Sequence, residues 1–307
     1  MNGVLVLEQI LNGLQFGVML FLITAGLTLT FGIMNLVNLA HGILYMLGAY
    51  FCARLVVVTG SFLGSIVLAL AGAVIVGILI ELLTLKRLYA RNHLDQVLAT
   101  FGVTLFFNEI VRVIWGPASI YFSVPTSLSG QIELIPGLFY PAYRLVIIAV
   151  GLAAAASLVF MINFTKLGML IRAGASNRVM VSAMGVNINL LNTLVFGLGA
   201  GFAALAGAVA GPLLTVESGM GNDMLILALV VIVIGGIGSI KGAFIASLAV
   251  GLIDTFGRTM LRPLFELIMS QKAANNAGPA VASMLIYLAM ALVLFFRPQG
   301  LFPPRTR

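Results

Sequence analysis

Three polar side chains lie close together in an apolar stretch and could contact a small polar solute. They are Asn35, Asn38 and His41, and Gly32 and Gly42 flank them. Glycine lets the backbone leave helical geometry, and amide or imidazole groups can satisfy the freed N–H and C=O groups. Because such a break in a membrane must face protein or a water-lined cavity, we expect a solute to pass beside it. The alternative is that these side chains only hold the break together.

A second glycine-rich break is expected at residues 235–242, inside a run that is otherwise mostly apolar from 224 to 262. It lacks the Gly-Lys-Ser/Thr ending of a nucleotide-binding P-loop. We predict that it lies opposite or near the first break. The predicted solute path then consists of Asn35, Asn38, His41, Gly42, Gly238 and Ser239.

Groups for catalysis or metal binding do not stand out in the sequence. His41 and His93 are far apart, Cys52 is the single cysteine, and no Ser/His/Asp set is recognisable. A metal site needs several such ligands at suitable spacing. We therefore predict no enzyme activity, no cofactor and no metal.

Charged residues in the apolar runs lie near the ends of the spans and have residues of opposite charge nearby. Glu109 and Arg112 are three residues apart and Asp254 and Arg258 are four apart, so local pairing on one helix face is predicted. Glu81 lies beside Lys86. An ion-driven carrier usually keeps an ionisable residue at mid-membrane, and His41 is the one candidate. The alternatives are an ion-coupled secondary transporter of small solutes and a passive channel, but the sequence favours a protein that draws its energy from a partner.

Residues 164–190 are basic, with Lys166, Arg172 and Arg178 and no acidic residue. A short helix is predicted from 172 to 184, and Gly185 ends it because glycine tolerates a positive φ. A short basic helix between two spans suits a partner on the cytoplasmic side, whereas the alternative is an ordinary basic loop. The predicted contact residues are Arg172, Ser176, Asn177, Arg178 and Gly185.

The composition places most of the chain in a membrane. Of the 307 residues, 61% are hydrophobic and 8% are charged, whereas a soluble domain is about 25% charged. The long runs show no two-residue alternation, so helices are expected, and at about 20 residues each roughly eight to ten would fit. The predicted fold class is an all-α polytopic membrane protein. The net charge of +7 is assigned to the inner face and not to nucleic-acid binding.

The expected spans are residues 10–31, 43–58, 62–84, 97–116, 143–163, 190–211 and 279–296, and residues 224–262 form an apolar run interrupted by the break at 235–242. Residues 1–9 contain no Lys or Arg, so the first span is expected to be retained and not cleaved as a signal. The loop at 85–96, the stretch 164–190, Lys241 and the tail from 297 hold 10 of the 16 Lys and Arg residues. These segments are predicted to be cytoplasmic, and the proline-rich residues 117–142 external. A further polar loop is expected at 263–278.

A short internal match predicts a duplication. Residues 11–17 (Leu-Asn-Gly-Leu-Gln-Phe-Gly) and 191–197 (Leu-Asn-Thr-Leu-Val-Phe-Gly) agree at five of seven positions. Each match opens a span that leads to a glycine-rich break, at 32–42 and at 235–242. We expect half-repeats at about 10–116 and 190–297 that run in opposite directions, as is common in transporters.

Several motifs, taken together, resemble a known family. They are Asn-Leu-Val-Asn-Leu-Ala-His-Gly at 35–42, Met-Leu-Gly-Ala-Tyr at 46–50, Arg-Ala-Gly-Ala-Ser-Asn at 172–177 with Met-Gly-Val-Asn at 184–187, Gly-Gly-Ile-Gly-Ser-Ile-Lys-Gly at 235–242, and Arg-Pro-Gln-Gly-Leu-Phe at 297–302. In this order they are similar to branched-chain amino-acid ABC transporter permeases of the LivH type. The resemblance implies one permease domain over residues 1–307, in the inner membrane of a bacterium. It also implies a second related permease, two cytoplasmic ATP-binding subunits and a periplasmic substrate-binding protein as partners, with membrane lipid around the subunit.

Two departures from the family pattern concern the substrate and the coupling segment. Ile43 follows the His-Gly pair where many relatives carry an acidic residue, and Ser176 and Asn177 stand where an acidic residue is often found. The first leaves branched-chain amino acids, urea, amides and aromatic acids open as substrates. The second leaves the docking role in place.

Overall fold

The computed structural model describes residues 3–34, 36, 38–89 and 91–302. These residues form a helical bundle with one short β-hairpin, and eight of the described helices are long and apolar enough to cross a membrane. This confirms the all-α polytopic fold predicted from the sequence. The chain is a multi-pass membrane protein.

The elements follow one another along the chain with short connections. They are α1 (Gly3–Met34), α2 (His41–Thr59), α3 (Phe62–Ile80), the π-helix η1 (Glu81–Leu85), α4 (Lys86–Leu88), α5 (His93–Trp115), the 3-10 turn η2 (Thr126–Leu128), β1 (Gln131–Ile135), β2 (Leu138–Pro141), α6 (Ala142–Phe164), α7 (Lys166–Ser176), α8 (Arg178–Ala183), α9 (Ile188–Ala210), α10 (Met220–Gly235), α11 (Ile240–Glu266) and α12 (Gln271–Phe296). Strands β1 and β2 pair antiparallel within the stretch 117–142, which was predicted not to span.

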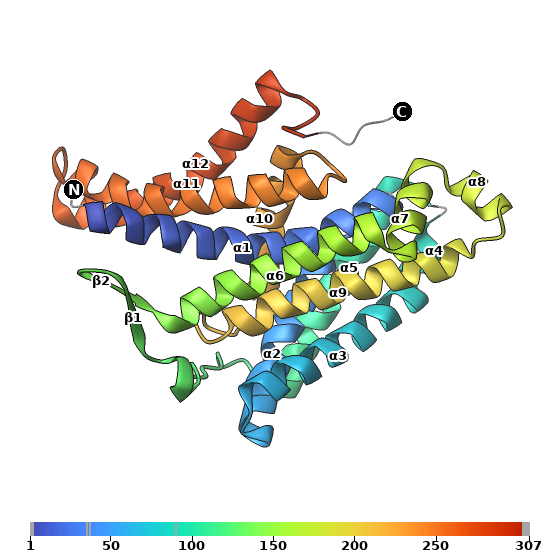
Figure 1. The fold of residues 1–307 in the computed structure, drawn as a ribbon, viewed down its shortest axis with the longest axis horizontal. Helices are drawn as coiled ribbons and strands as arrows, with labels where there is room; N and C mark the ends of the chain where they lie inside the picture. The colour runs from blue at the N-terminus through green and yellow to red at the C-terminus, as the bar shows by residue number, and fades with distance from the viewer. Residues whose placement is uncertain (1–2, 35, 37, 90, 303–307) are drawn as a thin grey trace.

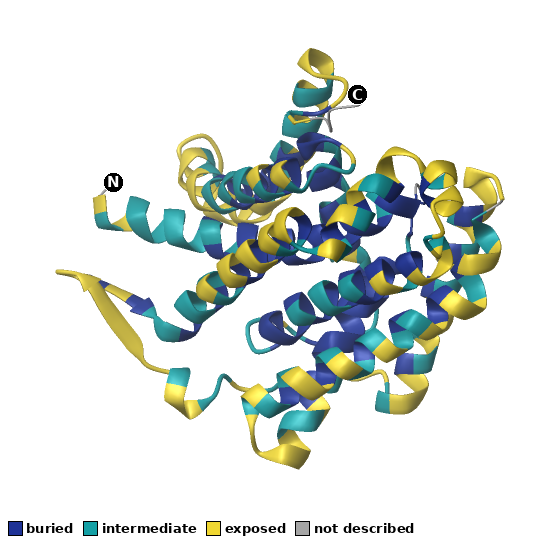
Figure 2. Cartoon of the chain, turned by 45° about the vertical axis from the view of Figure 1, so that its right-hand side comes forward, coloured by how far each residue is buried: buried dark blue, intermediate teal, exposed yellow. Residues whose placement is uncertain are grey.

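Helix α1 lies at the centre of the bundle (Figure 1), where it packs against α6, α9, α10 and α11. Its residues 17–30 are all buried, and Figure 2 shows the buried surface concentrated in this inner part of the bundle. A helix that is apolar on every side belongs in the interior, which is why α1 shows almost no one-sided pattern in its sequence.

Glycine residues set the distance between the central helices. A Cβ at Gly26 of α1 would lie 2.4 Å from the carbonyl oxygen of Gly199 on α9, and one at Gly251 of α11 would lie 2.4 Å from the carbonyl oxygen of Gly13 on α1. No side chain fits at such distances. Small residues let helix backbones approach closely in lipid, where packing replaces the hydrophobic effect between helices.

The two ends of the bundle differ. Helices α4, α7 and α8 lie at one end, and the β-hairpin and the N-terminus lie at the other (Figure 1). Gly238, in the turn between α10 and α11, lies against Gly32 near the end of α1, so this turn is also at the α7 end. The basic segments predicted to share one side of the membrane are therefore together, and we call this end the basic end.

The prediction of a polar loop at 263–278 is wrong about the length of the loop. Helix α11 continues to Glu266 and α12 starts at Gln271, so the connection covers only residues 267–270. Pro263 and Pro279 both lie inside helices. Helices in membranes tolerate proline because neighbours and local adjustments satisfy the freed backbone groups, and Arg262 and Glu266 form an i,i+4 ion pair at 3.1 Å that supports the last turn of α11.

Candidate functional site

The break between α1 and α2 holds two fully buried polar side chains, Asn38 and His41. The Asn38 Oδ1 accepts a hydrogen bond from the Ala40 N–H at 3.0 Å, and the His41 Nε2 lies 3.2 Å from the carbonyl oxygen of Ile23. Ile23 precedes the end of α1 by about 16 Å of helix. The chain therefore folds back after α1, and α2 begins beside the middle of α1.

The free atoms of these side chains have complementary hydrogen-bonding character. A carbonyl oxygen only accepts, so the His41 Nε2 carries the hydrogen and the Nδ1 of the neutral ring is an acceptor. Within the described residues neither this Nδ1 nor the Asn38 Nδ2, a donor, has a partner, and the Tyr45 hydroxyl one turn further along α2 has none either. Buried polar groups are nearly always paired, so these atoms are equipped to bind a polar molecule. Asn35, also predicted here, lies outside the described residues.

Helix α10 starts directly against the start of α2. A Cβ at Gly42 would lie 2.2 Å from the carbonyl oxygen of Gly221, and a Cβ at Gly221 would lie 2.1 Å from that of Gly42. The N-termini of two helices thus meet inside the bundle, and each N-terminus carries a partial positive charge. Gly42 is therefore placed in the break with Asn38 and His41, and its lack of a side chain permits the contact.

The start of α10 was missed in the sequence, where a span was expected only from 224. The helix begins at Met220, preceded by Gly219 with a φ of 97°. Two glycines around one methionine were the signal available, since Gly219 allows the left-handed turn and Gly221 allows the close approach.

The other two residues of the predicted path lie closer to the basic end. Gly238, with a φ of 81°, is in the turn that precedes α11, and the Ser239 Oγ accepts a hydrogen bond from the Gly242 N–H at 3.1 Å as the N-cap of α11. A Cβ at Gly32 would lie 3.7 Å from the Gly238 Cα. The turn is thus near the Gly32 side of the first break, whereas His41 packs on Gly26, about two turns further inside along α1.

The basic segment is built as two helices, so the single helix predicted over 172–184 is wrong. Asn177 interrupts it with a φ of −153°, and its Oδ1 accepts a hydrogen bond from the Met180 N–H at 3.0 Å. An asparagine that caps the following helix competes with continuation of the preceding one. Gly185, with a φ of 86°, follows the end of α8 as predicted.

The two arginines predicted to contact a partner are bound to their own chain. Arg172 donates a hydrogen bond to the carbonyl oxygen of Ile162 near the end of α6, and Arg178 donates one to that of Ile33 near the end of α1. Both carbonyls belong to the last helical turn, where cations are favourable. Burial lowers the pKa of Arg178 from its usual value, and the nearby Tyr89 raises it in part.

Large apolar side chains are exposed on α8 and at the residue that follows it. Val179 is 81% exposed, Met180 60% and Met184 78%. We call these three residues the α8 knob. The contact residues predicted from the sequence do not include the knob, although Met180 and Met184 are four residues apart and so share one side of a helix. Ser176 and Asn177 are exposed beside it.

A buried carboxylate lies under the basic segment. Glu81, in the π-helix η1, is 0% exposed and accepts hydrogen bonds from the Tyr89 hydroxyl at 2.6 Å and the Thr193 hydroxyl at 2.8 Å. Burial raises the pKa of Tyr89, and the bond to Glu81 raises it further. Lys86 is near Glu81 in the sequence, but the hydrogen bonds of the carboxylate are to these two hydroxyl groups.

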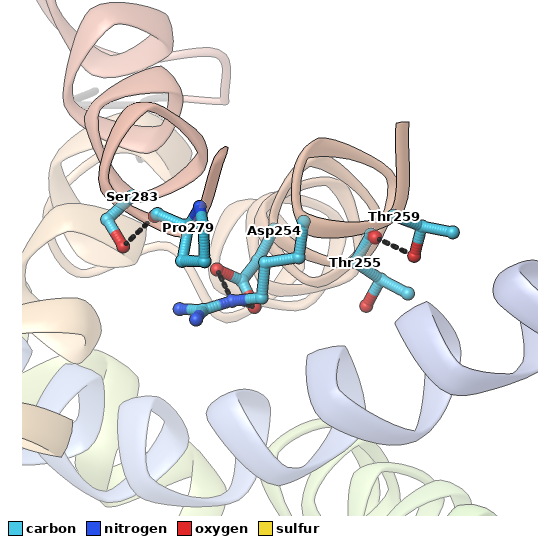
Figure 3. A network of polar contacts seen from close by, with 6 residues as sticks. Asp254, Thr255, Thr259, Pro279 and Ser283 are labelled. Atoms are coloured by element: carbon cyan, nitrogen blue, oxygen red, sulfur yellow. Dashed lines mark hydrogen bonds and ion pairs between the residues drawn. The ribbon is translucent and has the colours of Figure 1, made fainter. Parts of the chain in front are cut away.

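The predicted ion pairs are confirmed. Arg112 and Glu109 are 3.1 Å apart, and the Arg258 Nε lies 2.9 Å from both carboxylate oxygens of Asp254. Figure 3 shows Asp254 between α11 and the turn of α12 that carries Pro279 and Ser283. Within the described residues no group of three or more His, Cys, Asp or Glu side chains could hold a metal ion.

Comparison with known proteins gives a consistent assignment. The family model described as a branched-chain amino acid transport system permease component matches residues 9–294. The chain belongs to this family. The match covers all eight helices long enough to span, and it makes the chain a permease subunit of an ABC importer; nothing found supports the ion-coupled alternative.

Curated relatives match over most of their own length. The permease protein BraD of the high-affinity branched-chain amino acid transport system of Pseudomonas aeruginosa is 29% identical over 96% of this chain and 95% of its own. The corresponding LivH protein of Escherichia coli is 27% identical over 86% of this chain and 90% of its own. A probable LivH protein of Methanocaldococcus jannaschii is 27% identical over 81% and 80%. No solved structure matches significantly.

Proposed function

We propose that this permease subunit imports branched-chain amino acids across the inner membrane of a bacterium. Its partners are two cytoplasmic ATP-binding subunits, a second related permease and a periplasmic substrate-binding protein. The family match over residues 9–294 carries the proposal, and the similarity to the branched-chain amino acid permeases BraD and LivH supports the substrate. The chain is not itself an enzyme, and ATP hydrolysis takes place in the partners.

The substrate crosses at the meeting point of α2 and α10. The free Asn38 Nδ2 can donate to a carboxylate, and the free His41 Nδ1 can accept from an ammonium group. The two helix N-termini favour the carboxylate, and apolar residues such as Ile43 and Leu225 surround the break. This combination suits a zwitterion with an apolar side chain. Gly42 and Gly221 are in contact, so the two helix starts must separate during passage.

The two halves of the chain form an inverted repeat, at about 10–116 and 190–297. Helices α1 and α2 correspond to α9 and α10, because the matched residues 11 and 191 are 180 positions apart and Gly42 and Gly221 are 179 apart. The equivalent of the first break is then the segment before α10, in place of 235–242. This correspondence supports the meeting point as the centre of the subunit, as in other transporters built from such repeats.

The conformational change that accompanies ATP hydrolysis is transmitted to the substrate route through α7 and α8. The α8 knob fits an apolar groove on an ATP-binding subunit, since exposed methionine and valine at an aqueous surface favour burial. Arg172 and Arg178 tie these helices to the ends of α6 and α1. Movement of α8 is therefore transmitted to the end of α1, which leads directly into the break. Ser176, Asn177 and Gly185 set the angle between α7, α8 and the next span.

The transport function is tested with the complex reconstituted in proteoliposomes. Uptake of labelled leucine is expected to require ATP, the ATP-binding subunits and the binding protein together. Uptake by this chain alone, driven by a proton or sodium gradient, would overturn the proposal in favour of a secondary carrier. Competition by isoleucine and valine, but not urea, is expected if the substrate is assigned correctly.

The route is tested with Asn38→Ala and His41→Ala in the same complex. Each is expected to raise the KM for leucine at unchanged amounts of assembled complex, because each removes one contact to the zwitterion. Thr100→Val is a matched control, since Thr100 is buried on α5 and bonds only within its own helix. Loss of thermal stability with an unaltered KM in both variants would mean that these residues only hold the break together.

A further inference from the structure

A cavity of about 290 Å³ lies at the basic end, between α1, α6, α7 and the start of α11. Its lining includes the polar residues Thr28, Asn163, Arg172, Ser239 and Lys241 as well as apolar residues such as Val159 and Ile162. No acidic residue is among its lining residues. The cavity is separate from the meeting point of α2 and α10, because Gly42 and Gly221 do not line it.

Two cationic side chains from different elements face this cavity. Arg172 comes from α7 and Lys241 from the first turn of α11. Arg172 donates one N–H to the carbonyl oxygen of Ile162. Because a guanidinium group has five N–H donors, most of its donors are available to a ligand. Neither residue forms an ion pair within the described part of the chain.

The start of α11 adds backbone donors. This helix has 27 residues, and Ser239 caps only the Gly242 N–H. The N–H groups of Ile240 and Lys241 have no partner inside the helix, because the first turn lacks preceding carbonyls. Together with the partial positive charge of the helix end, they favour an anion.

A third polar group comes from α1. Thr28 lines the cavity, is 2% exposed, and its hydroxyl has no hydrogen-bond partner among the described residues. A threonine in a helix commonly bonds back to a carbonyl of its own turn, as Thr24 does to Leu20 at 2.5 Å. The Thr28 hydroxyl is therefore available to a ligand in the cavity.

We propose that this cavity binds the phosphate of an anionic phospholipid of the cytoplasmic leaflet. Arg172, Lys241 and the first turn of α11 contact the phosphate, and the Thr28 hydroxyl contacts the head group. The acyl chains follow Val159, which is 41% exposed on the outer face of α6. The apolar lining residues and the exposed Val159 favour a lipid over free phosphate. Basic pockets between helices on the cytoplasmic side are suited to anionic head groups.

Bound lipid would connect the coupling segment to the core of the subunit. Arg172 belongs to α7, Lys241 to α11 and Thr28 to α1, and one lipid, through its phosphate and its head group, would join all three. The proposal does not depend on which solute is transported, so it can fail while the transport function stands.

The test is native mass spectrometry of the purified full chain with phosphatidylglycerol or phosphatidylcholine added at equal concentration. The unaltered chain is expected to retain phosphatidylglycerol at least fivefold better. Lys241→Gln combined with Arg172→Gln should bring this ratio near one, and Thr28→Val should lower it about twofold. The matched control is Lys86→Gln combined with Arg87→Gln, which removes two exposed charges from the same end outside the cavity.

Four outcomes are decisive. An unchanged ratio in the Lys241 and Arg172 variant overturns the proposal, and so does an equal fall in the control, which would mean general surface charge. Displacement of the lipid by millimolar inorganic phosphate would overturn the lipid as ligand and assign the cavity to a free anion. Because loss of Arg172 also releases α7 from Ile162, Lys241→Gln alone is measured as well; a ratio equal to that of the unaltered chain in this variant counts against the site.

Discussion

The contact between Gly42 and Gly221 predicts a large effect from one added methyl group. In Gly42→Ala the Cβ would lie 2.2 Å from the Gly221 carbonyl oxygen, so α2 and α10 must move apart by about 1 Å to reach the closest distance that Cβ atoms tolerate. Overpacking of this kind typically costs about 1–3 kcal/mol. At about 2–4 °C per kcal/mol for a protein of a few hundred residues, the Tm should fall by roughly 2–12 °C.

The assay is thermal unfolding of the purified chain in detergent, followed by leucine uptake after reconstitution. Gly102→Ala is the control, because a Cβ at Gly102 of α5 meets nothing within 4 Å and alanine favours a helix over glycine by about 1 kcal/mol. Its Tm should be equal to that of the unaltered chain or slightly higher. Equal Tm values for the two variants would refute the close contact and the placement of α10 against α2.

Three further predictions concern the basic end. Val179→Asp should leave insertion and Tm unchanged but abolish co-purification with the ATP-binding subunits, whereas Arg178→Gln should lower Tm and retain co-purification; the reverse result would contradict the role of the α8 knob. Glu81→Ala should cost about 1–3 kcal/mol, because it removes the fully buried carboxylate that accepts hydrogen bonds from the Tyr89 and Thr193 hydroxyl groups. The cost is measured as a shift in Tm, and no shift would mean that Glu81 is solvated. The raised pKa of Tyr89 stabilises the folded state below the pKa of the unfolded tyrosine, about 10, and this contribution is lost as the pH rises through the folded value. Tyr89→Phe should therefore lose less stability between pH 9 and 11 than the unaltered chain, as measured by Tm; identical slopes would contradict the shift.

The spans were predictable because long apolar runs have few alternatives in a chain that is 8% charged. The break before His41 was predictable as well, since Gly and Asn interrupt an apolar run there. The position of the start of α2 in the bundle was not predictable. It depends on which backbone carbonyl group the His41 side chain contacts, and the sequence does not show that this is the carbonyl group of Ile23. The contact of Gly42 with Gly221 joins residues far apart in the sequence, and nothing local specifies it.

The direction in which a charged side chain points, toward its own bundle or toward a partner, was the least predictable feature. Basic residues in residues 164–190 correctly marked one end of the bundle, but Arg172 and Arg178 turn inward to the carbonyl oxygens of Ile162 and Ile33. Helix ends offer acceptors within reach of a long side chain, and the sequence does not reveal which helix end is close by. The predicted interface stays a prediction for the segment, and two of its five side chains, Arg172 and Arg178, donate hydrogen bonds within their own chain.

The length of α1 makes the subunit sensitive to the thickness of the membrane. Its 32 residues extend for about 48 Å, whereas the hydrocarbon core is about 30 Å thick. A tilt of about 20° shortens the projection only slightly, so part of α1 must project beyond the acyl chains, where Arg178 binds the carbonyl oxygen of Ile33. A thicker bilayer would immerse this contact in lipid and favour a more upright α1. The length of the lipid acyl chains would then alter the proposed coupling from α8 through the end of α1 to the break between α1 and α2, although the lipid contacts neither the substrate nor ATP.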